Sequence, residues 1–305
     1  MNRRDFMTAG MTTGAAVAMG AQSRIAQGAK SRRAKFRMKY APHFGMFKNS
    51  AGNNPIDQLK FAADEGFTAW EDNGMMSKSV ELQNDIAKTM KQLDMTMGVF
   101  VSSGGFDRSE FTTSTSKDLH GRLRAQMKKA VEVAKRVNAK WSTFVPGNIS
   151  LKLEHDYQMA NCIENLKVCA EVCEPAGLAL VLEPLNWWSN HPGLFLTTIP
   201  QGYLICKGVG SPSVKILDDL YHQQISEGNL IPNMDKAWDE IGYFQIGDNP
   251  GRKEPTTGEI NYKNIFKHIH DKGYKGVLGM EHGNSKKGKE GEQAVIEAYR
   301  YCDSF

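Results

Sequence analysis

Leu178-Ala179-Leu180-Val181-Leu182 is followed directly by Glu183, so an apolar run of strand length ends in a carboxylate. The same arrangement recurs three times further along the chain. The strand-like runs 214–217, 241–244 and 276–280 end in Asp218-Asp219, Gln245 and Glu281. From Glu183 through Asp219 and Gln245 to Glu281, the successive spacings are 36, 26 and 36 residues. Because a strand–helix unit takes roughly 30 residues, these spacings predict consecutive parallel strands.

The rest of the chain continues the alternation of strands and helices. Earlier candidate strands lie at 37–41, 67–70, 96–101 and 141–145. Candidate helices lie at 55–65, 79–93, 117–137, 157–175, 199–207, 233–240, 263–272 and 290–302. Eight such units in about 270 residues predict an α/β fold, a (β/α)8 TIM barrel over residues 36–305. The carboxyl ends of barrel strands build the active site, so the four polar residues are expected to converge there.

Three acids and one amide at the strand ends indicate a metal site. Oxygen ligands of this kind suit a hard divalent cation, Mg²⁺ or Mn²⁺. For any single acid the alternative is a solvated or salt-bridged strand terminus. Asp218 competes with Asp219, but strand alternation would direct Asp218 to the other face of the sheet. The spacing of the four residues favours the metal site.

Composition restricts the partners and the redox chemistry. The chain has 305 residues and a formal net charge of +4, with much of the basic excess near its N-terminus. This distribution does not predict a nucleic-acid partner. The five cysteines are an odd number, which argues against a complete disulfide framework. Cys162, Cys169 and Cys173 share one helical face, where buried small hydrophobes are favoured over a soft-metal site.

Residues 1–35 resemble an export segment. Arg3-Arg4 is followed by Asp5-Phe6 and by a small-residue stretch from Thr8 to Ala21. The stretch is too short and too rich in glycine and threonine to span a bilayer stably. We therefore expect twin-arginine export to the periplasm or the extracellular space, without stable membrane insertion after cleavage. A disordered basic tail is the alternative.

The site motifs carry a resemblance to a known family. They are Leu182-Glu183-Pro184-Leu185-Asn186, Asp219-Leu220-Tyr221-His222, residues 245–252 with Pro250-Gly251-Arg252, residues 258–262 and Gly279-Met280-Glu281. Together they resemble hydroxypyruvate isomerase. More widely they resemble the xylose-isomerase-like TIM barrels, which include ketose 3-epimerases and endonuclease IV. The resemblance covers nearly all of the chain after the export segment.

The resemblance implies roles for individual residues. A divalent metal would be held by Glu183, Asp219, Gln245 and Glu281. Glu183 and Glu281 would also form the catalytic acid/base pair. His222 and Arg252 match substrate-contacting positions of related isomerases. His43 is a weaker pocket candidate, whereas His282 is expected to be solvated.

The function implied is metal-dependent isomerisation of a small hydroxy-carbonyl substrate. Hydroxypyruvate would become 2-hydroxy-3-oxopropanoate through an enediolate. Export, together with Trp187, Trp188 and His191 in the loop after Glu183, leaves a ketose or sugar-acid epimerase or isomerase open. A noncatalytic sugar-binding barrel and an endonuclease-IV-like phosphodiesterase are further alternatives, and the latter needs more histidines than the strand ends offer. Assembly into a homo-oligomer is compatible with all of these.

Overall fold

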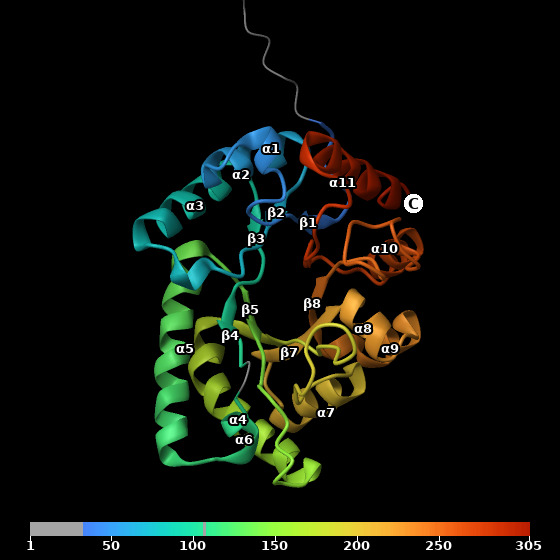
Figure 1. Ribbon diagram of the computed structural model, residues 1–305. Helices are drawn as coiled ribbons and strands as arrows, with labels where there is room; N and C mark the ends of the chain where they lie inside the picture. The colour runs from blue at the N-terminus through green and yellow to red at the C-terminus, as the bar shows by residue number, and fades with distance from the viewer. Residues whose placement is uncertain (1–32, 106–107) are drawn as a thin grey trace, which may run out of the picture. The chain divides into compact units, whose positions relative to one another are not determined.

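The computed structural model describes residues 33–105 and 108–305, which form a parallel TIM barrel surrounded by helices (Figure 1). The strands are β1 (Lys39–Ala41), β2 (Ala69–Trp70), β3 (Thr96–Met97), β4 (Val101–Ser103), β5 (Trp141–Phe144), β6 (Ala179–Leu182), β7 (Val214–Asp219), β8 (Ile241–Gln245) and β9 (Val277–Gly279). Seven of them form one sheet in the order β1-β9-β8-β7-β6-β5-β4, and β2 pairs with β3. The predicted fold class is confirmed.

The nine strands occupy eight barrel positions because the third position is interrupted. The single strand predicted over 96–101 is wrong: residues 98–100 separate β3 from β4. Gly98 passes so close to Tyr243 that a Cβ there would lie 2.3 Å from the tyrosine hydroxyl oxygen. The Glu71 backbone N–H donates to Pro42 O at 3.0 Å, which connects the chain after β1 to the chain after β2.

The outer layer consists of helices whose bounds largely follow the predictions. They are α1 (Lys48–Ala51), α2 (Pro55–Asp64), α3 (Val80–Gln92), α4 (Glu110–Thr113), α5 (Lys117–Val137), α6 (His155–Cys173), α7 (Ile199–Val209), α8 (Leu220–Ser226), α9 (Leu230–Ala237), α10 (Tyr262–Asp271) and α11 (Gly288–Cys302). The helix predicted over 233–240 begins earlier and ends in a 3-10 turn over Trp238–Glu240. Helix α8 was not predicted; it begins at Leu220 because the Asp219 carboxylate accepts from the Tyr221 and His222 backbone N–H groups.

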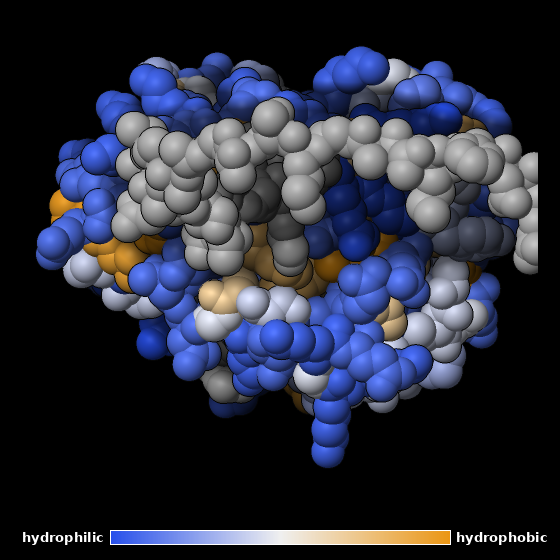
Figure 2. Space-filling view, turned by 90° about the horizontal axis from the view of Figure 1, so that it is seen from above, coloured by the Kyte–Doolittle hydropathy of each residue, from blue (hydrophilic) through white to orange (hydrophobic). Residues whose placement is uncertain are grey.

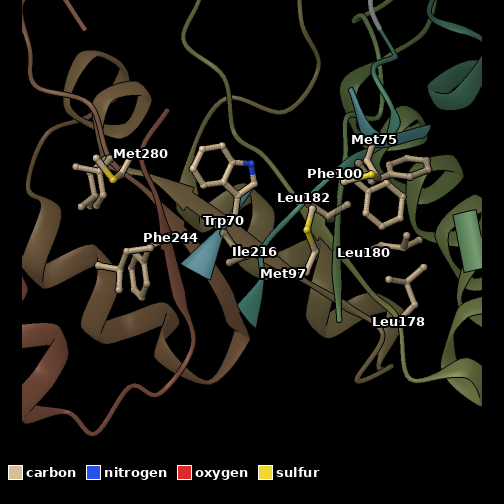
Figure 3. Close-up of a cluster of buried hydrophobic side chains, with 14 of the residues drawn as sticks. Trp70, Met75, Met97, Phe100, Leu178, Leu180, Leu182, Ile216, Phe244 and Met280 are labelled. Carbon is tan, nitrogen blue, oxygen red and sulfur yellow. The ribbon is translucent and has the colours of Figure 1, made fainter. Parts of the chain in front are cut away.

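Apolar side chains from strands and helices form the core (Figure 3). Trp70, Leu182, Ile216 and Phe244 are completely buried in it. This burial explains why the strands appear in the sequence as nearly continuous apolar runs. The face shown in Figure 2 is mainly hydrophilic, with apolar residues in small groups between polar ones. The helices therefore bury one face and present polar residues to solvent.

The cysteines behave as small hydrophobic residues. All five cysteines are buried and have free thiols: Cys162, Cys169, Cys173, Cys206 and Cys302. Burial raises the pKa of the Cys173 and Cys206 thiols to about 12. Neutral, buried thiols are poor nucleophiles and poor metal ligands, so the prediction made for the helix α6 cysteines is confirmed.

The predicted export segment falls almost entirely outside the described residues. Its assignment, and the domain boundary at residue 35, stay predictions that localisation of the full-length chain can check. Within residues 33–105 and 108–305, the structure contains no helix with the length and apolarity needed to cross a membrane.

Candidate active site

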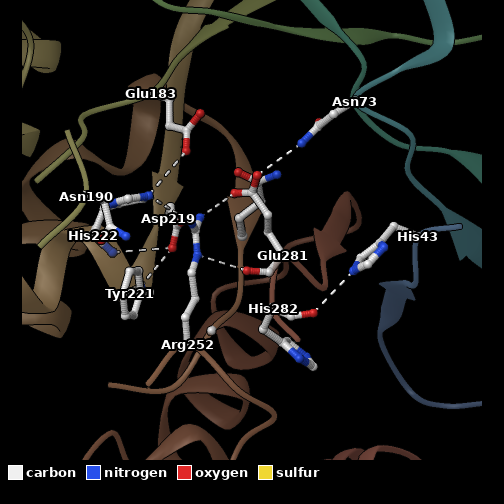
Figure 4. Close-up of polar contacts among 12 residues, drawn as sticks. His43, Asn73, Glu183, Asn190, Asp219, Tyr221, His222, Arg252, Glu281 and His282 are labelled. Atoms are coloured by element: carbon white, nitrogen blue, oxygen red, sulfur yellow. Dashed lines mark hydrogen bonds and ion pairs between the residues drawn. The ribbon is translucent and has the colours of Figure 1, made fainter. Parts of the chain in front are cut away.

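Four polar residues meet at the carboxyl ends of neighbouring strands, as expected, and Glu183, Asp219 and Glu281 are seen in Figure 4. Glu183 follows β6, and Asp219 and Gln245 end β7 and β8, where they are register partners. Glu281 lies two residues beyond β9, whose Gly279 pairs with Gln245. The side chains of Glu183, Asp219 and Gln245 are buried, and that of Glu281 is 25% exposed. Only Glu281 therefore has substantial contact with solvent.

Arg252 connects two of these acids. Its Nη2 donates to Asp219 Oδ2 at 2.9 Å and to Glu281 Oε2 at 2.8 Å. Its guanidinium carbon also lies 4.9 Å from the centre of the Tyr221 ring, at cation–π distance. The structure thus places Arg252 at the site, as the sequence predicted, and shows that it holds Asp219 beside Glu281.

The loop after β8 holds Arg252 in an unusual backbone conformation. Arg252 has φ of 49°, in the left-handed region that a non-glycine residue enters at a cost of about 1 kcal/mol or more. Asp248 is completely buried and organises this turn. Its backbone pairs with Arg252 and Lys253, and its carboxylate accepts from the Gly258 and Ile260 N–H groups. These bonds maintain the turn and aim Arg252 at the acids.

The tautomer of His222 follows from its neighbours. Asn186 Oδ1 accepts from the Ser189 N–H, which leaves the Asn186 amide nitrogen to donate to His222 Nδ1 at 2.6 Å. Burial lowers the pKa of His222 to about 3, so its ring is neutral near pH 7. With Nδ1 accepting, the proton lies on Nε2.

This Nε2–H group is a buried donor that faces two acids. It lies 3.9 Å from Glu183 Oε1 and 3.6 Å from Asp219 Oδ2, and it has no hydrogen-bond partner among the described residues. Glu183, Asp219 and His222 each provide one potential ligand atom, and these three atoms all lie within 4.8 Å of one another. A protonated nitrogen cannot bind a cation, so His222 is better suited to donate to a substrate oxygen.

Burial and mutual repulsion control the ionisation of the acids. Burial, followed by the charges of Glu281 and Asp219, raises the pKa of Glu183 well above its ordinary value. Burial raises the pKa of Glu281 to about 7, although Arg252 opposes this shift. Asp219 differs: burial raises its pKa, but His222, Arg252 and two backbone N–H groups together keep it below its ordinary value.

We expect Glu281 to make stability depend on pH in the metal-free protein. Its folded pKa of about 7 exceeds the ordinary 4.5, so the folded state binds the proton more tightly. The resulting stabilisation is present below pH 4.5 and is lost as the pH rises through 7. The melting temperature of wild type relative to Glu281→Gln should therefore fall between pH 5 and 8. A pH-independent difference in thermal unfolding would contradict this assignment.

The charges and donor atoms fit a divalent cation. The Arg252 guanidinium pairs with Asp219 and Glu281 and lies within electrostatic range of Glu183, so one positive charge faces three carboxylates. The buried Gln245 Oε1 has no hydrogen-bond partner among the described residues. Three carboxylates and an amide oxygen form the donor set that Mg²⁺ and Mn²⁺ prefer.

Asp218 does not belong to this cluster. It is fully buried, and both of its carboxylate oxygens are without a hydrogen-bond partner within the described part of the chain. Burial raises its pKa well above the ordinary value. Asp219, in contrast, makes the contacts with Arg252 and with the start of helix α8. This difference favours Asp219 over Asp218 as the site residue.

A cavity of about 230 Å³ adjoins Glu281 on the side of β1 and β2. Its lining consists of His43, Phe44, Glu71, Asp72, Asn73, Gly74 and Glu281. Asn73 Nδ2 donates to Glu281 Oε1 at 3.0 Å, and His43 Nε2 lies 3.2 Å from His282 O. His43 therefore lies at a cavity beside the acids, where a small molecule could bind.

Some site residues were missed or misplaced by the sequence prediction. Glu71 and Asn73 were not singled out, although Glu71 follows an apolar run just as the other strand-end acids do. His282 was expected to be solvated, and that is wrong because its side chain is buried. His282 Nε2 lies 3.0 Å from the Tyr299 hydroxyl oxygen, and burial lowers its pKa to about 3. A neutral, fully packed ring indicates a structural role.

The fold is a TIM barrel, and the polar residues at the carboxyl ends of its parallel strands form the candidate active site. The chain belongs to the xylose isomerase-like TIM barrel family, whose model matches residues 59–304. A D-psicose 3-epimerase from Clostridium cellulolyticum H10, solved with D-tagatose, shares the fold with a TM-score of 0.71 and 18% identity. That match covers 87% of this chain and 98% of the epimerase.

Two curated relatives are named isomerases. Hydroxypyruvate isomerase from Escherichia coli (strain K12) is 35% identical over 153 residues, which cover 50% of this chain and 59% of the relative. A 2-oxo-tetronate isomerase from Cupriavidus necator is 37% identical over 123 residues, 40% of this chain and 47% of the relative. The matches thus span less than two thirds of either relative. The resemblance to hydroxypyruvate isomerases that the motifs indicated is confirmed.

Proposed function

We propose that this protein is a divalent-metal-dependent isomerase that moves a carbonyl group between adjacent carbons of a small hydroxy-carbonyl acid. The convergence of Glu183, Asp219, Gln245 and Glu281 beside Arg252 and His222 carries the proposal. Hydroxypyruvate, which would become 2-hydroxy-3-oxopropanoate, is the first candidate substrate because a relative is named for it. The hydroxypyruvate isomerase and the 2-oxo-tetronate isomerase described above are both named for substrates that are carboxylates.

The cation would be held by the four strand-end residues, with Mg²⁺ or Mn²⁺ as the best match to their oxygen donors. When bound, it supplies Lewis-acid stabilisation of the negative charge that develops on the substrate oxygens. Arg252 contacts two of the acids in the metal-free arrangement. Its guanidinium would have to release at least part of this contact for those carboxylates to act as ligands.

The protein's own groups suit the proton transfers. One glutamate removes a proton from the carbon that bears the hydroxyl group, and the electron pair forms the double bond of an enediolate. A proton is then returned to the neighbouring carbon, so that one hydrogen changes carbon and one proton changes oxygen. A pKa of about 7 allows Glu281 to accept and release protons near neutral pH. His222 Nε2–H is available to donate to a substrate oxygen.

A ketose or sugar-acid isomerase or epimerase is the second candidate. The cavity beside Glu281 extends past the reacting groups toward residues 43–44 and 71–74, which provides polar surroundings for a longer hydroxylated chain. The relative named 2-oxo-tetronate isomerase supports a sugar acid in particular. All four residues of the predicted site, three acids and one amide, are present in the sequence. Their presence favours catalysis over a noncatalytic sugar-binding barrel.

Arg252 provides the test that separates the two substrate classes. If the substrate is an acid, Arg252→Ala should raise its KM by roughly 10- to 100-fold, because a partly buried anion loses a charged hydrogen-bond partner. A neutral ketose should show a much smaller change in KM. Steady-state kinetics on one acid and one ketose provide the measurement, with the neighbouring Lys253→Ala as the control. An unchanged KM for an acid that wild type converts efficiently would contradict the role of Arg252 and favour a neutral sugar.

A further inference from the structure

A buried pair of a carboxylate and a tyrosine, Glu71 and Tyr243, adjoins Gln245 of the proposed metal site. Glu71 follows β2, is 2% exposed and has no assigned part in the proton transfers. Its Oε2 accepts from the Tyr243 hydroxyl at 3.1 Å. Tyr243 lies on β8, two residues before Gln245, so both side chains share one face of that strand. Glu71 therefore connects β2 to the strand that carries Gln245.

The barrel leaves space for this pair at two glycines. A Cβ at Gly279 on β9 would lie 1.9 Å from Glu71 Oε2, and a Cβ at Gly98 would lie 2.3 Å from the Tyr243 hydroxyl oxygen. Real Cβ atoms do not approach heavy atoms so closely, so any side chain at either position would displace the pair. The chain thus accommodates a buried carboxylate where aliphatic side chains would ordinarily fill the interior of the barrel.

The nitrogen and the oxygen of the Gln245 side-chain amide have different surroundings. The Gln245 Nε2 atom lies 3.5 Å from both carboxylate oxygens of Glu71. The Gln245 Oε1 atom is buried and has no hydrogen-bond partner among the described residues. Because the Tyr243 hydroxyl donates to Glu71 Oε2 and both Glu71 oxygens face the Gln245 amide nitrogen, Glu71 receives the NH₂ end of the amide. The carbonyl oxygen is left for another partner.

We propose that Glu71, itself held by Tyr243, is a positioning residue that keeps the carbonyl oxygen of Gln245 directed at the bound cation. This inference rests on the proposed function, because it assigns Gln245 as a ligand. An amide has two chemically different ends of nearly equal size, and only its oxygen binds a hard cation. Glu71 removes the orientation in which the NH₂ group would face the cation.

Metal affinity tests the positioning role without relying on catalysis. We expect Glu71→Ala to weaken Mn²⁺ binding to the metal-stripped full chain by roughly 10- to 100-fold, as is usual for partners of metal ligands. Glu71→Gln retains an acceptor oxygen for Gln245 and can direct its own NH₂ at the Tyr243 hydroxyl. It should therefore bind Mn²⁺ within about threefold of wild type. Isothermal titration calorimetry measures all of these affinities.

A double variant shows whether Glu71 acts through Gln245. In a Gln245→Ala background the amide is gone, so removing Glu71 as well should weaken Mn²⁺ binding no further. Glu292→Ala is the matched control, since Glu292 is another buried acid, 1% exposed and hydrogen-bonded to Asn49. It should lower the melting temperature and leave Mn²⁺ affinity unchanged. If Glu71→Ala does not fold, Tyr243→Phe removes the hydroxyl that holds Glu71 and should also weaken Mn²⁺ binding.

Each outcome distinguishes this inference from the proposed function. Wild-type Mn²⁺ affinity in both Glu71→Ala and Tyr243→Phe would overturn the positioning role. Equal losses in Glu71→Gln and Glu71→Ala would show that charge, and not orientation, is what matters, and would also overturn it. Additive losses in the double variant would do the same. Failure of the wild-type protein itself to bind Mn²⁺ would instead contradict the proposed function.

Discussion

Glu183→Gln and Glu281→Gln are each expected to abolish proton exchange while the barrel stays folded. Loss of one acid/base group commonly lowers the rate ~10²–10⁴-fold, and loss of a metal ligand adds to this. Glutamine keeps the size of the side chain, so neither variant leaves a cavity, although Glu281→Gln weakens the charge-assisted contacts with Arg252 and Asn73. Turnover and the exchange of substrate protons with solvent are the measurements, both followed by NMR.

The control is an acid of similar burial that lies away from the proton transfers. Glu254 is 2% exposed and accepts from the Ser285 backbone N–H, so Glu254→Gln should affect stability and leave the catalytic rate close to that of wild type. Circular dichroism confirms that each variant is folded. Near-wild-type turnover in either Glu183→Gln or Glu281→Gln would remove that residue from the acid/base pair.

Removal of the divalent cation is expected to stop activity entirely without unfolding the protein. The core that contains Trp70, Leu182 and Phe244 is apolar and continuous, so it does not require an ion to hold its strands together. Without the ion, Arg252 would face the charge of three carboxylates, two of which it contacts. Chelation followed by gel filtration yields the metal-free protein, and Mg²⁺ or Mn²⁺ should restore turnover.

Two measurements accompany this experiment. The far-ultraviolet circular dichroism spectrum of the metal-free protein should match that of the loaded protein, while its melting temperature should be lower because a bound ligand stabilises the folded state. Elemental analysis establishes that the site is empty. Full activity in a protein shown to contain no metal would eliminate the cation from the mechanism.

Much of the fold was predictable because its signals are local. Apolar runs of strand length and the regular spacing of the units are both visible in the chain. The convergence of Glu183, Asp219, Gln245 and Glu281 followed from one rule, that parallel strands end on the same side of a barrel. His222 and Arg252 were predicted from a family resemblance, and both lie beside Asp219; their contact with a substrate stays a prediction.

The remainder depends on contacts between distant segments. Glu71 follows a strand of only two residues, and its burial depends on the missing side chains of Gly98, just after β3, and of Gly279 on β9. The proton position on His222 depends on Asn186, whose orientation is itself fixed by Ser189. The third strand is divided where Gly98 passes close to the hydroxyl of Tyr243 on β8. Apart from Ser189, which follows Asn186 by three residues, none of these partners is close in sequence to the residue that it affects.

The most direct test of the central claim is deuterium incorporation from solvent by the Mg²⁺-loaded wild-type protein. Hydroxypyruvate, a four-carbon sugar acid and a ketose would each be incubated with the protein in D₂O and followed by NMR. We predict conversion of at least one acid, with deuterium at the carbon that gains the hydrogen, and loss of both signals after chelation. Absence of conversion and of exchange for every compound, in a protein shown to contain bound Mg²⁺, would contradict the account.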